Sequence, residues 1–370
     1  MRIVITGGNG FIGRNLFCRL RELKPSSLVS LSRESPWDTW EAALRGADFV
    51  FHLAGVNRTT GSEAEFYSGN VELTARVCQV LESAGRSPTL VYASSTQAVL
   101  DNHYGRSKAL GEDVVRDFAV RNKSRGIVFR LPNVFGKWAR PNYNSVVATF
   151  CYNLNHGLPL SINDPNAELN LLYIDDLADQ LVELLGSGSA SGLHSIRDVY
   201  QTSVGELAAT LRAFSSGRAA LEVPNASSGM SRALYATFIS YLPTRSFAYS
   251  LTPATDKRGL FSEVFRTEAC GQFSFFTAHP GVTRGNHYHH TKTEKFLVVQ
   301  GKARFIFRNV STAESFKLDV EGTVPQIVET IPGWAHSIQN IGSTELIALL
   351  WANERFDPKR PDTIPFEVEP

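Results

Sequence analysis

The chain has 370 residues, of which 43% are hydrophobic and 20% charged, and its formal net charge is +1. This length suits about two domains of ordinary globular composition. A near-zero charge without a long run of either sign argues against nucleic acid as a partner, and no apolar run is long enough to span a membrane. A strand predicted to begin at Arg2 leaves no room for a signal peptide. The 4 cysteines lack paired spacing, so we expect a protein of the reducing cytoplasm.

A glycine-rich turn between a strand and a helix is the first motif. Residues 2–6 are apolar and β-branched, the turn occupies 7–13, and residues 14–23 have helical spacing. This order directs the amides at a helix N-terminus toward a pyrophosphate, although the G-x-x-G-x-x-G spacing also suits a plain strand–helix connection. Arg33 follows the predicted second strand. An arginine there suits the 2'-phosphate of NADP, and a solvated loop arginine is the alternative.

A tyrosine and a lysine one helical turn apart form the second motif. A strand predicted at 89–96 ends in hydroxyl residues, and Tyr104 and Lys108 follow on one face of a helix. An ammonium beside a phenol lowers the pKa of the phenol, so Tyr104 is a candidate proton donor near neutral pH. A nearby serine hydroxyl can hydrogen-bond the reacting carbonyl. The pair is common by chance, and the upstream glycine turn gives it weight.

The hydrophobic pattern of the sequence changes near residue 259. Short alternating apolar runs follow at 273–277, 296–299, 303–307, 327–331 and 346–351. Strands at this spacing, with turn residues between them, predict a β-barrel or jelly roll. The boundary is expected within 243–253, where Pro and Ser/Thr cluster and the helical periodicity stops. We therefore predict domains at 1–245 and 256–370.

The predicted barrel carries a candidate metal site. His287 and His289 are two residues apart, so both rings project from one face of a strand. Glu294 begins the next apolar run, and His336 follows a Pro-Gly pair. Three imidazoles and a carboxylate suit Zn, Mn, Fe or Ni, and the ligand types alone do not choose among them. The alternative is that these residues are packed polar groups of the barrel core.

These motifs resemble two known families. The residues that carry a resemblance to extended short-chain dehydrogenase/reductases of the nucleotide-sugar type are 6–13 (TGGNGFIG), 52–55 (HLAG), 94–96 (SST), Tyr104 with Lys108, and 130–136 (RLPNVFG). The residues that carry a resemblance to cupins are His287-x-His289-x4-Glu294-x6-Gly301 and Pro332-Gly333 followed by His336 and Asn340. The resemblances imply an α/β, Rossmann-type doubly wound parallel sheet followed by an all-β cupin barrel. Two departures are a short interval before Tyr104 and a stretch after Arg33 that looks too short for a full strand.

The reductase resemblance implies roles for the matching positions. Tyr104 would be the catalytic acid, Lys108 would bind the nicotinamide ribose, and Ser95 would bind the carbonyl, with Ser94 and Thr96 as rivals. The residues expected to bind NADPH are Gly7, Gly10, Phe11, Ile12, Gly13, Arg33, Leu53, Ala54 and Lys108. Asn133 is expected to face the sugar nucleotide. Arg140 is a candidate phosphate or uracil contact, and an exposed loop is the alternative.

The order of the two halves resembles the bifunctional UDP-sugar reductase/epimerases of bacterial capsule and O-antigen synthesis. The resemblance implies a homodimer that acts on a UDP-4-keto-6-deoxy amino sugar, with C3 epimerised in the cupin half and C4 reduced by NADPH. The implied product is UDP-2-acetamido-2,6-dideoxy-L-talose, on the route to UDP-N-acetyl-L-fucosamine.

A chemical argument supports this fusion. A ketone at C4 acidifies the proton at C3, and a divalent metal, with zinc as our choice, would stabilise the enolate oxygen or only hold the barrel together. Lys295 is our choice of base, with Tyr288 and Lys292 as rivals. The alternative functions are a monofunctional 4-ketoreductase with a structural or oligomerising cupin, and a non-catalytic NADP-binding regulator.

Overall fold

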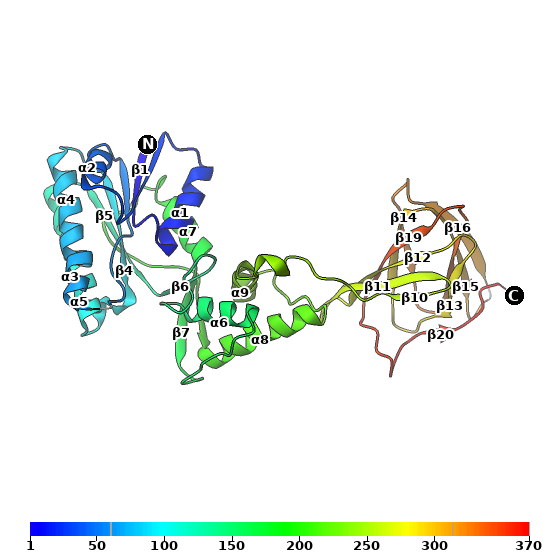
Figure 1. The fold of residues 1–370 in the computed structure, drawn as a ribbon. Coiled ribbons are helices and arrows are strands. Elements are labelled where there is room, and N and C mark those ends of the chain that lie inside the picture. The colour runs from blue at the N-terminus through cyan, green and yellow to red at the C-terminus, as the bar shows by residue number, and fades with distance from the viewer. Residues whose placement is uncertain (60, 313, 370) are drawn as a thin grey trace. The chain divides into compact units, whose positions relative to one another are not determined.

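The structure is a computed structural model, and it describes residues 1–59, 61–312 and 314–369. The chain forms an α/β part followed by an all-β part, which confirms the predicted fold class (Figure 1).

The chain divides into two compact units, which we describe separately. The first unit holds Met1–Leu211 and Ala233–Leu242, and the second holds Arg212–Arg232 and Pro243–Pro370. The chain therefore enters the second unit at residue 212, returns to the first at 233 and enters the second again at 243.

A parallel six-stranded sheet is the centre of the first unit, with the strand order β2-β1-β3-β4-β5-β8. Its strands are β1 (Arg2–Thr6), β2 (Ser27–Leu31), β3 (Phe49–His52), β4 (Thr89–Ser95), β5 (Arg125–Leu131) and β8 (Gly192–His194). The central strands are buried along almost their whole length, as expected for a parallel sheet covered on both faces. The strand order reverses between β1 and β3, and ligands of such sheets bind at that point, beyond the carboxyl ends of the strands.

Helices cover both faces of this sheet. Helices α2, α4 and α5 lie on one face, and α1 and α7 lie on the other (Figure 1). The helical segments up to α7 are α1 (Phe11–Glu22), α2 (Trp37–Arg45), α3 (Ala64–Tyr67), the π-helical turn η1 (Ser68–Glu72), α4 (Leu73–Ser83), the 3-10 turn η2 (Thr96–Val99), α5 (His103–Arg121), α6 (Val146–Asn155) and α7 (Ile174–Glu183). The short stretch after Arg33 thus forms helix α2, which buries Trp40 and Leu44 against the sheet.

A smaller sheet and two further helices complete this half of the chain. The small sheet has the order β6-β7-β9. These remaining elements are β6 (Asn133–Phe135), β7 (Glu168–Tyr173), β9 (Val199–Ser203), α8 (Val204–Ala219), α9 (Gly229–Ser240) and the 3-10 turn η3 (Thr244–Ser246). Strand β6 begins at Asn133, so the small sheet positions the residue predicted to face the sugar nucleotide.

Two antiparallel sheets pack face to face in the second unit. Their strand orders are β10-β11-β12-β19-β14-β17 and β16-β15-β18-β13-β20. The strands are β10 (Ala254–Asp256), β11 (Gly259–Arg266), β12 (Gln272–Ala278), β13 (Thr283–Tyr288), β14 (Glu294–Gln300), β15 (Lys302–Asn309), β16 (Ser315–Glu321), β17 (Ile327–Thr330), β18 (Trp334–Asn340), β19 (Leu346–Ala352) and β20 (Ile364–Pro365). Phe276, Phe296 and Phe305 are buried between the sheets. This is the predicted cupin-like barrel.

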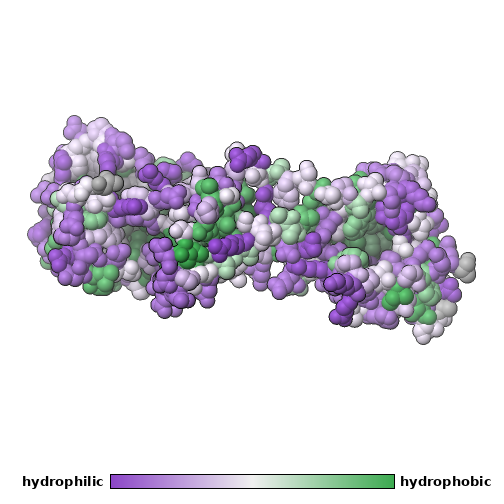
Figure 2. Space-filling model, turned by 60° about the horizontal axis from the view of Figure 1, so that its bottom comes forward, coloured by the Kyte–Doolittle hydropathy of each residue, from purple (hydrophilic) through white to green (hydrophobic). Residues whose placement is uncertain are grey.

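The surface is mixed in character. Hydrophilic residues cover much of the visible face and are interrupted by separate apolar patches (Figure 2). Among the residues described, none of the helices has the length and apolar character needed to cross a membrane.

Candidate functional sites

The glycine turn holds β1, α1 and the end of β3 in close contact. Gly7 has a φ of +71°, and a Cβ on it would lie 2.7 Å from the Ala54 nitrogen. A Cβ on Gly13 would lie 2.3 Å from the Gly7 carbonyl oxygen. Helix α1 begins at Phe11 without a side-chain cap. The amides of its first turn are therefore directed at the space beyond the turn, which suits a phosphate group.

A cleft of about 550 Å³ opens at this turn. Its walls bring together the predicted cofactor, catalytic and substrate residues. The predicted residues in its lining are Gly7, Gly10, Phe11, Ile12, Gly13, Leu53, Ser95, Tyr104, Lys108, Asn133 and Arg140. Two predicted cofactor residues are not in this lining. Ala54 is packed against Gly7, and Arg33 is exposed just beyond β2.

Tyr104 lies in the first turn of α5, beside the end of β4. Its phenol interacts by a hydrogen bond with Ser95, whose side chain is buried. Burial raises the pKa of Tyr104, and the hydrogen bond with Ser95 offsets this only in part. The predicted lowering of this pKa by Lys108 is therefore wrong for this structure. The phenol is held in its neutral form, which is the form that donates a proton.

Lys108 is buried one turn further along the same helix. Its ammonium donates a hydrogen bond to the Ala93 carbonyl at 2.9 Å. Burial lowers the pKa of Lys108 to about 8, although the nearby Glu112 carboxylate acts in the opposite direction. The ammonium is thus bound to the β4 backbone rather than to Tyr104, which explains why burial decides the pKa of the phenol.

The three hydroxyl residues after β4 differ in their surroundings. Ser94 donates a hydrogen bond at 2.5 Å to Glu112, which also accepts two hydrogen bonds from Arg130 at 2.9 and 2.7 Å. Thr96 is exposed. Ser95 is the one of the three whose hydrogen bond acts on the pKa of the Tyr104 phenol, which favours it as the carbonyl-binding hydroxyl. Glu112 was not named from the sequence as the acceptor of the Ser94 and Arg130 hydrogen bonds. Its position one turn after Lys108 on the same helix was a usable signal.

The end of β2 presents two opposite charges. Arg33 is exposed, and the next residue, Glu34, accepts hydrogen bonds from Ser32 at 2.6 Å and from Asn9 of the glycine turn at 3.2 Å. These hydrogen bonds lower the pKa of the Glu34 carboxyl, and that from Ser32 contributes most. A carboxylate at this position suits the ribose 2'-hydroxyl of NAD, whereas an arginine suits the 2'-phosphate of NADP. The sequence reasoning named only the arginine.

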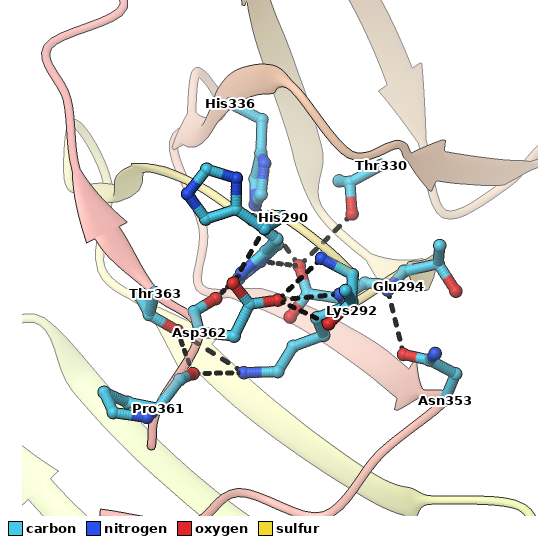
Figure 3. A network of polar contacts seen from close by, with 12 residues as sticks. His290, Lys292, Glu294, Thr330, His336, Asn353, Pro361, Asp362 and Thr363 are labelled. Atoms are coloured by element: carbon cyan, nitrogen blue, oxygen red, sulfur yellow. Dashed lines mark hydrogen bonds and ion pairs between the residues drawn. The ribbon is translucent and has the colours of Figure 1, made fainter. Parts of the chain in front are cut away.

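The four predicted metal ligands converge in the second unit. One ligand atom from each of His287, His289, Glu294 and His336 lies within 4.8 Å of the others. Figure 3 shows Glu294 and His336 of this set. Glu294 Oε2 is 3.2 Å from the Nε2 atoms of both His289 and His336. Bonds of about 2.0–2.2 Å to zinc place neighbouring ligand atoms roughly 3–3.5 Å apart. The donor set and its spacing therefore fit a divalent metal.

A β-bulge aligns two of these ligands. Strand β13 pairs with β18, and the register shifts at Asn286 so that His287 lies opposite His336. Gly285, just before the bulge, has a φ of +96°, and a Cβ on it would lie 2.8 Å from the His336 carbonyl oxygen. A side chain at this position would separate the two ligand strands, so the glycine is needed for the close approach.

Two members of the cluster, His287 and Glu294, have the charge states that bind metals. Burial lowers the pKa of His287 to about 4, which keeps the imidazole neutral. Burial raises the pKa of Glu294, but hydrogen bonds from His289 and His336 outweigh it and hold the pKa well below its usual range. A neutral imidazole and an ionised carboxylate are the protonation states that coordinate a metal. For His289, burial lowers the pKa, but hydrogen bonds with Glu294 and the Asp362 carbonyl outweigh it and raise the pKa, so a metal would displace a proton there.

None of the three predicted bases is directed at the cluster. Lys295 follows Glu294 on β14, so strand alternation turns it to the opposite face, where it is paired with Glu329. This placement argues against Lys295 as the epimerase base. Tyr288 packs against Phe366, and the Lys292 ammonium donates a hydrogen bond to the carbonyl of Pro361.

The fold and the two sites together define a nucleotide-binding sheet with a reductase-type Tyr/Ser/Lys constellation, followed by a cupin-like barrel with a metal-ligand cluster. The chain belongs to the NAD dependent epimerase/dehydratase family, whose model matches residues 3–194. A second model, the polysaccharide biosynthesis C-terminal domain, matches residues 254–364. The first match confirms the resemblance of the N-terminal half at the level of the family.

Two relatives match nearly the whole chain, and a third matches about two thirds of it. A Pseudomonas aeruginosa protein, UDP-2-acetamido-2,6-beta-L-arabino-hexul-4-ose reductase, is 47% identical over 98% of this chain and 98% of its own. The crystal structure of the capsular polysaccharide assembling protein CapF from Staphylococcus aureus covers 100% of both chains, at 39% identity and a TM-score of 0.92. The Thermus thermophilus UDP-glucose 4-epimerase, solved with NAD, shares the fold at 17% identity and a TM-score of 0.55, over 67% of this chain and 100% of its own.

Proposed function

We propose that the chain is a bifunctional enzyme that epimerises C3 and reduces C4 of a UDP-4-keto-6-deoxy amino sugar. The product would be UDP-2-acetamido-2,6-dideoxy-L-talose, and the reductant NADPH. One observation carries the proposal: a single cleft holds the glycine turn together with Tyr104, Ser95 and Lys108, in a chain related over its whole length to a UDP-sugar reductase. We further propose domains at 1–245 and 256–370 and a homodimer.

The first unit would perform the reduction. A bound NADPH would supply the hydride for C4, and the Tyr104 phenol would donate a proton to the C4 oxygen. Ser95 hydrogen-bonds the carbonyl oxygen, and Lys108 binds the nicotinamide ribose. Asn133 and Arg140, both in the cleft lining, would contact the sugar nucleotide. The side-chain hydrogen bond between Ser95 and Tyr104 supports this role because it places both hydroxyl groups at one point of the cleft.

The second unit would exchange the C3 proton. His287, His289, Glu294 and His336 would hold a divalent metal, which we propose is zinc. Such an ion, when bound, supplies Lewis acidity for an enolate oxygen. Three of these side chains, His289, Glu294 and His336, are buried, which limits the access of water and strengthens their charge interactions. A C3 proton next to the C4 ketone is acidic enough for exchange, and the reduction at C4 would then fix the inverted configuration.

Turnover in deuterated water tests both activities in one experiment. The full chain, NADPH and the UDP-4-keto sugar should give one NADPH oxidised per product and deuterium at C3, measured by absorbance and mass spectrometry. Absence of NADPH oxidation would leave the regulator alternative. Oxidation with only protium at C3 would refute the epimerase and leave the monofunctional ketoreductase. A panel of UDP- and dTDP-4-keto sugars would identify the nucleotide.

Cofactor choice gives a further prediction. Arg33→Ala should raise the KM for NADPH roughly 10- to 100-fold, because it removes a charge-assisted contact to the 2'-phosphate. The KM for NADH should stay unchanged, since NADH lacks this phosphate. Arg45→Ala, in the last turn of α2, is the matched control and should leave both values unaltered. An equal change for NADPH and NADH would contradict the role given to Arg33.

A further inference from the structure

The loop between the metal ligands His289 and Glu294 is held by a segment far along the chain. Residues 290–292 of this loop direct their backbone amides at the side chain of Asp362. The His290 amide donates to Asp362 Oδ1 at 2.9 Å, and the amides of Thr291 and Lys292 donate to Oδ2 at 2.9 and 2.8 Å. The Thr291 hydroxyl donates to the same Oδ2 at 3.1 Å. One carboxylate thus binds the amides of three of the four residues in the loop (Figure 3).

The backbone of the same residue binds a metal ligand directly. The Nδ1 atom of His289 donates a hydrogen bond to the Asp362 carbonyl oxygen. This bond requires the proton on Nδ1, so Nε2, the atom beside Glu294, is the nitrogen that would bind a metal once its own proton is displaced. Hydrogen bonds of this kind fix the tautomer and the ring orientation of histidine ligands. Asp362 therefore acts on His289 through its carbonyl and on the following loop through its carboxylate.

The neighbours of Asp362 are held by the same loop. The buried Lys292 ammonium donates to the Pro361 carbonyl at 2.7 Å and to the Thr363 hydroxyl at 3.4 Å (Figure 3). Asp362 itself has a φ of +38°, a left-handed conformation that an L residue adopts at a cost. The surrounding hydrogen bonds support that conformation, as is typical of strained residues at functional sites.

The next residues continue along a ligand-bearing strand. Strand β20 pairs with β13, with Pro365 opposite His287 and Ile364 opposite Tyr288. The Phe366 amide also donates to the Asn286 carbonyl at 2.8 Å, at the bulge. The segment 361–366, which we name the C-terminal strap, therefore contacts the backbone of β13 and residues 290–292 of the loop that follows it.

We propose that Asp362 is a positioning residue for the metal site, and that the C-terminal strap and the bound metal order each other. This inference rests on the metal site of the proposed function. Asp362 does not belong to the ligand cluster itself. It sets the direction of His289 and the path of the chain from His289 to Glu294, so that two of the four ligands reach the ion in the correct geometry. Coupling of this kind is reciprocal, so the metal should in turn stabilise the strap.

Substitution of Asp362 in the full chain tests the positioning role. Asp362→Asn keeps the size of the side chain but replaces one acceptor oxygen by an amide group, which cannot accept from the loop. Zn²⁺ affinity, measured by competition with a chromophoric chelator, should fall about 10- to 100-fold. The visible absorption of the Co²⁺-loaded variant should also change, because it reports ligand geometry. NADPH affinity should stay at the wild-type value and show that the chain is folded.

Asp357→Asn is the matched control. Asp357 lies in the same C-terminal segment and also accepts a backbone hydrogen bond, from the Lys359 amide at 2.9 Å, but that bond is local. It should leave Zn²⁺ affinity and the Co²⁺ spectrum unchanged. If Asp362→Asn has the wild-type Zn²⁺ affinity and Co²⁺ spectrum, the positioning role is overturned, while the metal site of the proposed function stands. A wild-type chain that binds neither Zn²⁺ nor Co²⁺ would instead refute the metal site of the proposed function, and the inference with it.

Hydrogen exchange on the wild-type chain tests the reciprocal effect without any substitution. Addition of Zn²⁺ to the metal-free protein should slow amide exchange at 290–292 and in the C-terminal strap. Exchange in β16, at the far edge of the five-stranded sheet, should change much less. Equal protection of β16 and the strap, or no protection of the strap, would contradict the coupling.

Discussion

Tyr104→Phe is expected to reduce the rate of ketone reduction roughly 10²- to 10⁴-fold, which is the usual contribution of a positioned proton donor. This loss corresponds to about 3 to 5 kcal/mol of transition-state stabilisation. The ring remains, so its contact with Phe66, with centroids 5.6 Å apart, and the packing of α5 are retained. NADPH affinity should therefore stay within about a factor of two, because the phenol donates its proton only in the transition state and does not bind the cofactor. Stopped-flow measurement of NADPH oxidation, with fluorescence titration of NADPH binding, checks both values.

Tyr152→Phe is the matched control for this substitution. Tyr152 lies on α6 and is stacked on His156 at 4.0 Å, away from the cleft lining. Loss of its hydroxyl should leave the rate unchanged. Wild-type turnover by Tyr104→Phe would remove the proton donor from the proposed mechanism, whereas loss of NADPH binding would show that the phenol holds the cofactor instead.

The residues that the sequence could predict are those whose chemistry depends on local spacing. The glycine turn, the Tyr104/Lys108 pair and the histidines two apart on β13 each combine a recognisable pattern with a known strand or helix period. The structure brings Tyr104 and Lys108 into one cleft and His287 and His289 into one cluster. Strand alternation also contained the information that Lys295 faces away from Glu294, and the sequence reasoning did not use it.

The features that the sequence could not predict depend on burial or on distant contacts. The raised pKa of Tyr104 follows from its burial and from the binding of Lys108 to the Ala93 carbonyl, and neither is visible in a Y-x-x-x-K pattern. Asp362 lies far along the chain from His289, in a tail without strand periodicity. The pairing of β20 with β13 and the hydrogen bonds of 361–366 bring them together.

Glu294→Gln is expected to separate the two proposed activities. The substitution keeps the volume of a buried side chain but removes the charge that lies 3.2 Å from two imidazoles. Loss of a partner outside the ligand set costs about 10- to 100-fold in metal affinity, so loss of a direct ligand should cost at least roughly 100-fold. Deuterium uptake at C3 should fall with the bound metal. NADPH oxidation with a ketone already inverted at C3 should continue, because the cleft of the first unit is untouched.

Three measurements on one preparation distinguish the alternatives: bound metal by elemental analysis, C3 deuterium by mass spectrometry, and the unfolding temperature. Glu329→Gln is the matched control, because Glu329 is an exposed carboxylate on β17 whose partner is the outward Lys295. It should retain metal, exchange and stability.

Wild-type exchange in a Glu294→Gln variant without metal would refute the catalytic role of the cluster. If the unfolding temperature falls together with metal content while exchange persists, the cluster is structural. Loss of exchange in a stable, metal-free variant is the expected result, since the barrel core between the two sheets is formed by apolar side chains rather than by the cluster.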